Sequence, residues 1–148
     1  MKVINRKFNR EYEALDTFEV GIVLNGPEVK SVWKEQIQLD GAFVKIIGNE
    51  AFLLNAVIPL YQFSQGKGYD QKRTRKLLLH KKELLKMQVK MASGNLTIAP
   101  RSCYNKGPYI KLEIALVRGR KEIEKRKLEK KRDIEQSQKR EMKEYLKS

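Results

Sequence analysis

The densest grouping of side chains that could bind a ligand is basic. Six of the seven residues in Lys72-Arg73-Thr74-Arg75-Lys76 together with Lys81-Lys82 are Lys or Arg, and only Asp70 and Glu83 lie nearby as balancing acids. Guanidinium and ammonium groups gathered in this way contact phosphate oxygens. A solvated protein face can have the same composition. We interpret the cluster as a phosphate-contacting surface at the junction of a loop and a helix.

Residues for catalysis or metal binding are sparse. His80 is the only histidine and Cys103 the only cysteine, so a histidine-based triad or a zinc site has too few members. Neither a G-x-x-x-x-G-K-[ST] nor a G-x-G-x-x-G phosphate loop occurs. We therefore expect no enzyme activity, no metal and no cofactor, with His80 structural or facing RNA and Cys103 filling the core. The aromatic residues, Trp33 among them, are expected mainly in the core, although any of them could stack on RNA.

The overall charge narrows the class of partner. The 148 residues carry 32 Lys and Arg against 18 Asp and Glu, a formal net charge of +14. Nucleic acid is the first candidate partner, and membrane surfaces and acidic proteins are the other polyanions. The most apolar run, residues 51–60, is too short to span a membrane, and residues 1–13 lack the apolar stretch of a secretory signal. One cysteine fits a reducing compartment, so we expect a cytoplasmic protein.

The composition changes near Val117, which divides the chain into a body of residues 1–117 and a tail of residues 118–148. The tail has 13 Lys and Arg, 7 Asp and Glu, and six sizeable apolar side chains. Those apolar groups are too few to order it alone, so we expect it to be disordered when free. Pairs at i,i+4 such as Glu122 with Arg126 favour a helix, which should form on a binding partner. A permanently solvated tail is the alternative.

The body is expected to be mainly β. Apolar segments bounded by turn residues predict strands at residues 18–24, 42–47, 51–58, 76–79, 95–104 and 109–117, with hairpin turns at 48–49 and 105–108. Two short helices are predicted, at residues 27–35 and 80–90, and residues 62–75 should form a loop. Five or six short strands with one or two short helices suggest a closed antiparallel barrel. The OB-fold is the common barrel of this size that binds oligonucleotides.

Three stretches in order carry a resemblance to a known family. They are Asn5-Arg6-Lys7 followed by FEVGIVL and GPEVKS at residues 18–24 and 26–31, RKLLLHKKE at 75–83, and residues 104–119 with KLEIAL inside them. Together they resemble small protein B, the SsrA-binding proteins of bacterial trans-translation. The resemblance runs from about Asn5 to Asp133 without large gaps.

The resemblance implies an OB-fold barrel that binds the tRNA-like domain of transfer-messenger RNA. It implies that this RNA, charged with alanine, is carried into the empty A site of a stalled ribosome, with elongation factor Tu involved only through the charged RNA. It also implies that the tail enters the vacant mRNA channel, along small-subunit rRNA near the decoding site, and becomes helical there. We expect a monomer with no membrane partner.

The expected interface residues combine two sets, the positions that the resemblance implies and the basic cluster. On the body they are Asn5, Arg6, Lys7, Glu28, Lys30, Lys72, Arg73, Arg75, Lys76, His80, Lys81 and Lys82. On the ribosome-binding tail they are Arg118, Arg120, Lys121, Glu124, Lys125, Arg126, Lys127, Lys130, Lys131 and Arg132.

Two positions depart from the family pattern. Pro27 stands where members commonly have a small residue, and Glu124-Lys125-Arg126 stands where they have Asp-Lys-Arg.

Two other functional classes stay open. One is a general RNA-binding OB protein, such as a translation factor or ribosomal protein. The other is an RNA-processing enzyme, which would need an acid, base or metal cluster that the sequence does not display.

Overall fold

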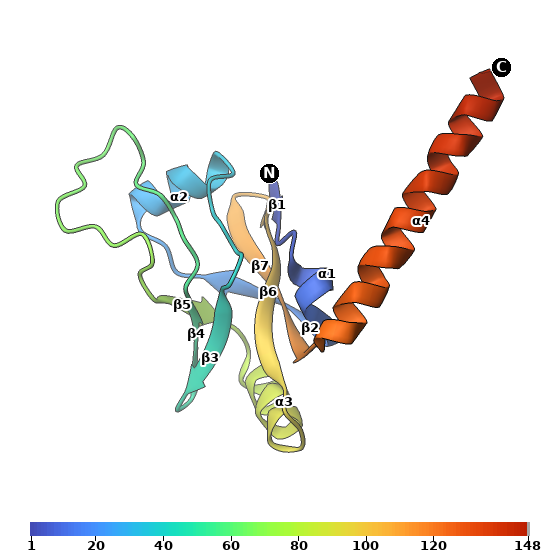
Figure 1. Ribbon diagram of the computed structural model, residues 1–148. Helices are drawn as coiled ribbons and strands as arrows, with labels where there is room; N and C mark the ends of the chain where they lie inside the picture. The colour runs from blue at the N-terminus through green and yellow to red at the C-terminus, as the bar shows by residue number, and fades with distance from the viewer. Residues whose placement is uncertain (148) are drawn as a thin grey trace.

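A seven-stranded antiparallel sheet is the main feature of the computed structural model, which describes residues 1–147 (Figure 1). The strands are β1 (Lys2–Ile4), β2 (Tyr12–Ile22), β3 (Phe43–Ile47), β4 (Glu50–Leu54), β5 (Arg75–Leu78), β6 (Thr97–Lys106) and β7 (Tyr109–Gly119). Their order is β1-β6-β3-β4-β5-β2-β7, and β7 also pairs with β6, so six of them form a closed ring. The mainly β, antiparallel architecture is confirmed, whereas the OB-fold-like barrel stays a prediction.

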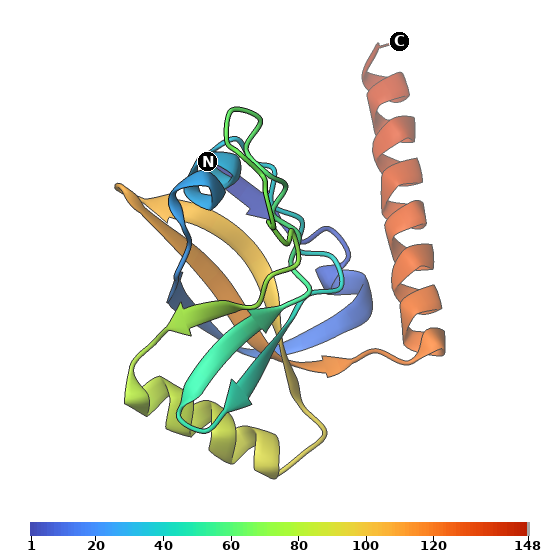
Figure 2. The same ribbon diagram turned by 90° about the vertical axis from the view of Figure 1, so that its left-hand side faces the viewer.

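Four helices accompany the sheet: α1 (Phe8–Glu11), α2 (Gly26–Trp33), α3 (Lys81–Ala92) and α4 (Glu122–Lys147). Helices α2 and α3 lie at opposite ends of the ring (Figures 1 and 2). Val32 of α2 and both Leu84 and Met87 of α3 are buried in the same apolar core as inward-facing side chains of β2 to β7. The two helices therefore remove the open ends of the ring from water, which is a main source of its stability.

Both predicted hairpins are present. Strands β3 and β4 pair up to Ile47 and Glu50 around the turn Gly48-Asn49, where Gly48 has a φ of 62°. Strands β6 and β7 pair up to Lys106 and Tyr109, which leaves a two-residue turn instead of the four residues predicted. Two-residue hairpin turns require positive φ, which glycine adopts without strain.

The N-terminal elements were not predicted. Strand β2 begins at Tyr12, six residues before the expected strand, and its pairing with β7 shifts register between Ala14 and Asp16. Such a bulge interrupts the alternation that marks a strand in a sequence. Strand β1 and helix α1 have three and four residues, too few to show a period.

The tail is helical in the structure, whereas it was expected to be disordered when free. Residues Glu122–Lys147 form one helix, α4, in the isolated chain. No described residue of α4 is buried. The prediction considered only burial within the tail and left out contacts between the tail and the body.

Those contacts join the start of α4 to α1. Lys125 Nζ lies 2.9 Å from a carboxylate oxygen of Glu11, and Arg10 forms an ion pair with Glu129. The backbone amide of Arg120 donates to the Glu11 carbonyl at 2.9 Å, and its guanidinium donates to the Asn9 carbonyl at 2.9 Å. Contacts with the body thus continue past residue 117 as far as Glu129, and the part of α4 beyond them projects away from the ring (Figure 2).

Candidate nucleic-acid interface

Glu28 lies in the first turn of α2, where hydrogen bonds with Asn25 orient its carboxylate toward the interior. The Asn25 side chain accepts a hydrogen bond from the Glu28 amide at 2.9 Å, and Glu28 Oε1 accepts one from the Asn25 amide at 3.1 Å. This reciprocal cap satisfies two amides that the helix start leaves unpaired. It also holds the side chain, which is fully buried, against the segment that leads into β5.

Two arginines from that segment bind the carboxylate. Arg75 donates from Nε to Glu28 Oε2 at 2.8 Å, and Arg73 forms an ion pair with Oε1. Arg75 also donates to the carbonyls of Ala56 at 2.8 Å and Gln71 at 3.1 Å. One guanidinium therefore joins α2, the segment after β4 and the loop before β5.

The electrostatics of this cluster keep Glu28 ionised. Burial by itself would raise the pKa of the carboxyl, but hydrogen bonds from Arg73, from the Asn25 amide and from Arg75 hold its pKa below the usual 4.5. Tyr69 completes the cluster, since its hydroxyl accepts from Arg75 at 3.4 Å and donates to the Ile58 carbonyl at 2.7 Å. Nothing in the sequence singled out Tyr69, which lies in a loop with no periodic pattern.

The prediction that Arg75 contacts phosphate is wrong. Its side chain is fully buried and its nitrogens donate to groups inside the protein. Arg73 differs, because its side chain is 41% exposed while Glu28 holds one edge of the guanidinium. Of this pair, Arg73 is the one that can reach a ligand.

The rest of the basic cluster is divided between two regions. Lys72 and Lys76 are exposed before and within β5, and Lys76 Nζ lies 3.1 Å from a Glu50 oxygen. Lys81 and Lys82 are exposed on the first turn of α3, at the opposite end of the ring from α2. His80 is the exposed residue before that helix, and its amide donates to Glu83 at 3.4 Å. The structure does not gather these side chains into one patch.

Asn5 is also internal. Its side chain is nearly buried and donates to the Pro100 carbonyl at 3.0 Å, while its amide donates to the Arg101 carbonyl at 2.8 Å. Asn5 thus fastens the N-terminal segment to β6, so its predicted place at the RNA interface is one of holding that segment in position. Arg6 and Lys7, which follow it, are exposed.

The predicted tail residues fall into two groups. Arg118 and Arg120 precede α4, where Arg118 forms an ion pair with Glu13 of β2. Lys125 is held by Glu11. Glu124 is half-buried, whereas exposed side chains include Arg118, Lys121, Arg126, Lys127, Lys130, Lys131 and Arg132.

Other chemistry finds little support in residues 1–147. They contain no group of three or more His, Cys, Asp and Glu residues that could hold a metal ion. None of their helices is long and apolar enough to cross a membrane. Cys103 is buried in the core, as predicted, and burial raises the pKa of its thiol to about 12.

Comparison with known proteins identifies the family. The family model described as SmpB protein matches residues 2–144. The chain belongs to the SmpB family. SsrA-binding proteins of Mycoplasma mycoides and Mesoplasma florum are 47% and 48% identical to it, over 92% and 95% of this chain and 93% and 95% of theirs.

A solved structure agrees with this assignment. A chain from a structure of tmRNA–SmpB at the center of the bacterial ribosome matches with a TM-score of 0.68 and 37% identity. The match covers 82% of this chain and 85% of that chain. The resemblance expected from the sequence is therefore confirmed.

The buried ion cluster predicts unequal stability effects of its two arginines. Arg75→Met should lower the free energy of unfolding by about 3–5 kcal/mol, because it leaves a buried carboxylate with one cationic partner. Arg73→Met, the matched control, should cost distinctly less because its side chain is partly solvated. Urea unfolding at pH 7 measures both changes, and equal losses would contradict the burial of Arg75.

The lowered pKa of Glu28 predicts a dependence of stability on pH. A carboxyl whose folded-state pKa lies below its ordinary value stabilises the fold above that value and loses this contribution as the pH falls. The unfolding free energy should therefore drop between about pH 5 and pH 3, and Glu28→Gln should drop less. Glu11, Asp16 and Glu19 also have lowered pKa values, so some slope remains in the variant. Parallel curves for the two proteins would refute the assignment.

Proposed function

We propose that this chain binds the tRNA-like domain of transfer-messenger RNA and brings it, charged with alanine, to the empty A site of a stalled ribosome. The observation that carries the proposal is the likeness, at 37% identity over 82% of this chain, to a chain from the tmRNA–SmpB ribosome structure. Elongation factor Tu takes part through the charged RNA. The protein acts as a cytoplasmic monomer and supplies no catalysis of its own.

The body provides the RNA-binding surface in this proposal. Folded RNA is recognised largely by shape and backbone contacts, which need cationic groups at fixed positions. The Glu28 cluster fixes Arg73 beside α2, and Lys30 and Lys72 are exposed on the connected segments. Because Glu28 cannot attract phosphate, its part is to hold these segments together.

The tail detects an empty channel in this proposal. At 1.5 Å per residue, helix α4 of 26 residues is about 39 Å long, enough to line a channel. Its exposed basic side chains would face rRNA phosphates. Messenger RNA already in the channel would exclude it by steric overlap and charge repulsion.

Tail deletion separates the two roles. A chain ending after Lys121 should keep most of its affinity for the tRNA-like fragment in a filter-binding assay, yet fail to support tagging of peptides on stalled ribosomes. The endpoint retains all of β7 and the Arg120 contacts, which a cut at Val117 would remove. An excess of unrelated structured RNA should not compete, which distinguishes this proposal from a general RNA-binding protein. Loss of nearly all affinity would contradict binding by the body.

Helix continuity in α4 can be tested at Leu128. Leu128→Pro should abolish peptide tagging nearly as completely as the deletion, because proline breaks a helix interior without changing the charge. The control is Leu128→Ala, which keeps the helix and should retain most of the activity. If Leu128→Pro tags at the normal rate, the tail acts as an unstructured polycation.

A further inference from the structure

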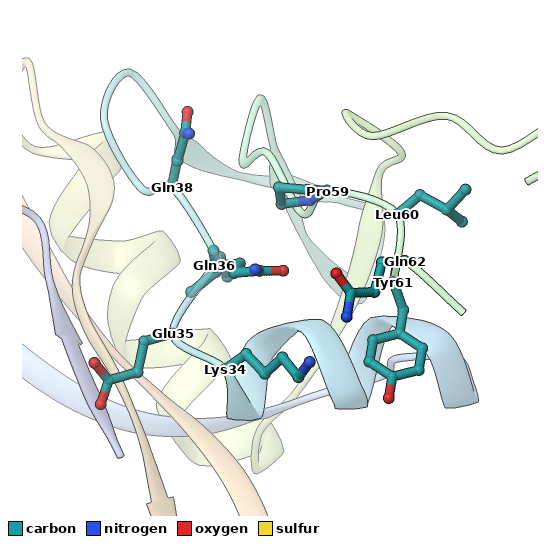
Figure 3. Close-up of a pocket in the computed structure, with 9 residues that line it drawn as sticks. Lys34, Glu35, Gln36, Gln38, Pro59, Leu60, Tyr61 and Gln62 are labelled. Carbon is teal, nitrogen blue, oxygen red and sulfur yellow. The ribbon is translucent and has the colours of Figure 1, made fainter. Parts of the chain in front are cut away.

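A cleft of about 400 Å³ lies between the end of α2 and the segment after β4 (Figure 3). Its walls include Lys34, Gln36, Gln38, Pro59, Tyr61 and Gln62. In Figure 3 the Gln36 amide points across the cleft toward Gln62, and Lys34 extends along α2 toward the Tyr61 ring. The volume is within the range of small-molecule sites, and side-chain amides supply both hydrogen-bond donors and acceptors.

Tyr61 lines one side of the cleft, and the Phe63 ring packs against it. Tyr61 and Phe63 meet edge to face, with centroids 5.4 Å apart and an angle of 71° between the planes. Phe63 is 75% exposed, although an apolar ring of this size gains free energy when it is covered. The pair therefore leaves aromatic surface available to a flat partner.

Two lysines flank the same rings. Lys34 Nζ lies 5.0 Å from the Tyr61 centroid and 5.7 Å from that of Phe63, and Lys30 Nζ lies 5.3 Å from the Tyr61 centroid. Glu35 is the acid next to them, and Figure 3 shows its carboxylate pointing away from Lys34. Exposed rings beside two cations match a ligand with a flat face and a negative charge.

We propose that this cleft binds one unpaired nucleotide of the tRNA-like domain of transfer-messenger RNA. The base stacks on the exposed Phe63 ring, which the edge-to-face contact with Tyr61 holds in place, and its phosphates lie against Lys30 and Lys34. Gln36, Gln38 and Gln62 can donate to or accept from the edge of the base. An acidic peptide would match the lysines but leave the rings and the amides without a counterpart.

The inference rests on the proposed function, and helix α2 links the cleft to the rest of the proposed RNA-binding surface. Lys30 and Lys34 belong to α2 or follow it directly, and Glu28 in the same helix holds Arg73 at the surface. The Ser31 hydroxyl of α2 donates to the Pro59 carbonyl at 2.8 Å and lies 3.2 Å from Gln36 Oε1, which holds the two walls of the cleft together. The cleft and the surface assigned to the RNA backbone therefore share helix α2.

The test combines affinity with direct crosslinking on the full-length chain. Tyr61→Leu and Phe63→Leu, singly and together, remove the rings but keep apolar bulk, and Tyr61→Phe keeps the ring. The matched control is Tyr109→Leu, an exposed tyrosine at the β6–β7 turn. The probe is the tRNA-like fragment, transcribed with 4-thiouridine for crosslinking and sequencing of the attached peptide.

We expect each ring variant to weaken binding roughly 5- to 150-fold, as loss of one stacked base does, with the dependence of affinity on salt unchanged. Lys30→Gln with Lys34→Gln should instead reduce the salt dependence, by about 0.7–0.9 in log K against log salt for each phosphate that is no longer neutralised. Tyr61→Phe, which keeps the ring, should lose much less affinity than Tyr61→Leu, and Tyr109→Leu should bind as the unchanged protein does. Crosslinks should attach an unpaired uridine to the peptide that contains Tyr61 and Phe63.

The contrary outcomes are distinct. Normal affinity of the double ring variant, or a crosslink to this peptide only from ribosomal RNA when ribosomes are added, would overturn the inference and leave the proposed function standing. Failure of the unchanged protein to bind the fragment would overturn both. Thermal unfolding of each variant separates weaker RNA binding from loss of the fold.

Discussion

A carboxylate without access to water needs cationic partners, and the end of the molecule that contains α2 depends on how Glu28 obtains them. Arg75 and Arg73 come from a segment more than forty residues further along the chain, and both bind the same carboxylate. The cluster therefore sets the position of α2 relative to β5 and the loop before it. Breaking one partner of a buried ion pair costs several kcal/mol, so this geometry is strongly fixed.

The same cluster explains an acidic residue inside a surface assigned to RNA. Glu28 neutralises the buried Arg75, whose charge could not otherwise be kept away from water. Arg73 then retains its exposed edge for a ligand, and the aromatic and amide side chains of the neighbouring cleft lie on the same scaffold. The tail is attached differently, through ion pairs with partly solvated side chains of α1, which weaken as the salt concentration rises. In the proposed function, the rigid body binds a folded RNA of fixed shape, and the weakly held helix is able to enter the mRNA channel when it is empty.

Strands with regular alternation and glycine turns could be predicted from the sequence, as β3, β6 and β7 demonstrate, whereas β4 ends at Leu54, four residues before the predicted end, because Asn55 has a φ of 63°. The burial of Arg75 was also implicit in the alternation, because Arg75 and Leu77 share one face of β5 and Leu77 is in the core. The count of basic residues obscured that signal. Asn5 and Tyr69 could not be placed, since their partners are carbonyls brought near only by tertiary folding. The contact of α4 with α1 could not be predicted for the same reason, because Glu11 and Lys125 are far apart in the sequence.

In the proposed mechanism Glu28 organises the RNA-binding surface without touching phosphate, and the affinity of Glu28→Gln for the tRNA-like fragment across a range of salt concentrations tests this most directly. The neutral amide keeps the size of the side chain but no longer balances the two arginines. We predict weaker binding at every salt concentration, with a slope of log K against log salt close to that of the unchanged protein, because every cationic side chain that neutralises phosphate is still present. Unchanged affinity, or a slope reduced by about 0.7–0.9 or more, would contradict this role of Glu28.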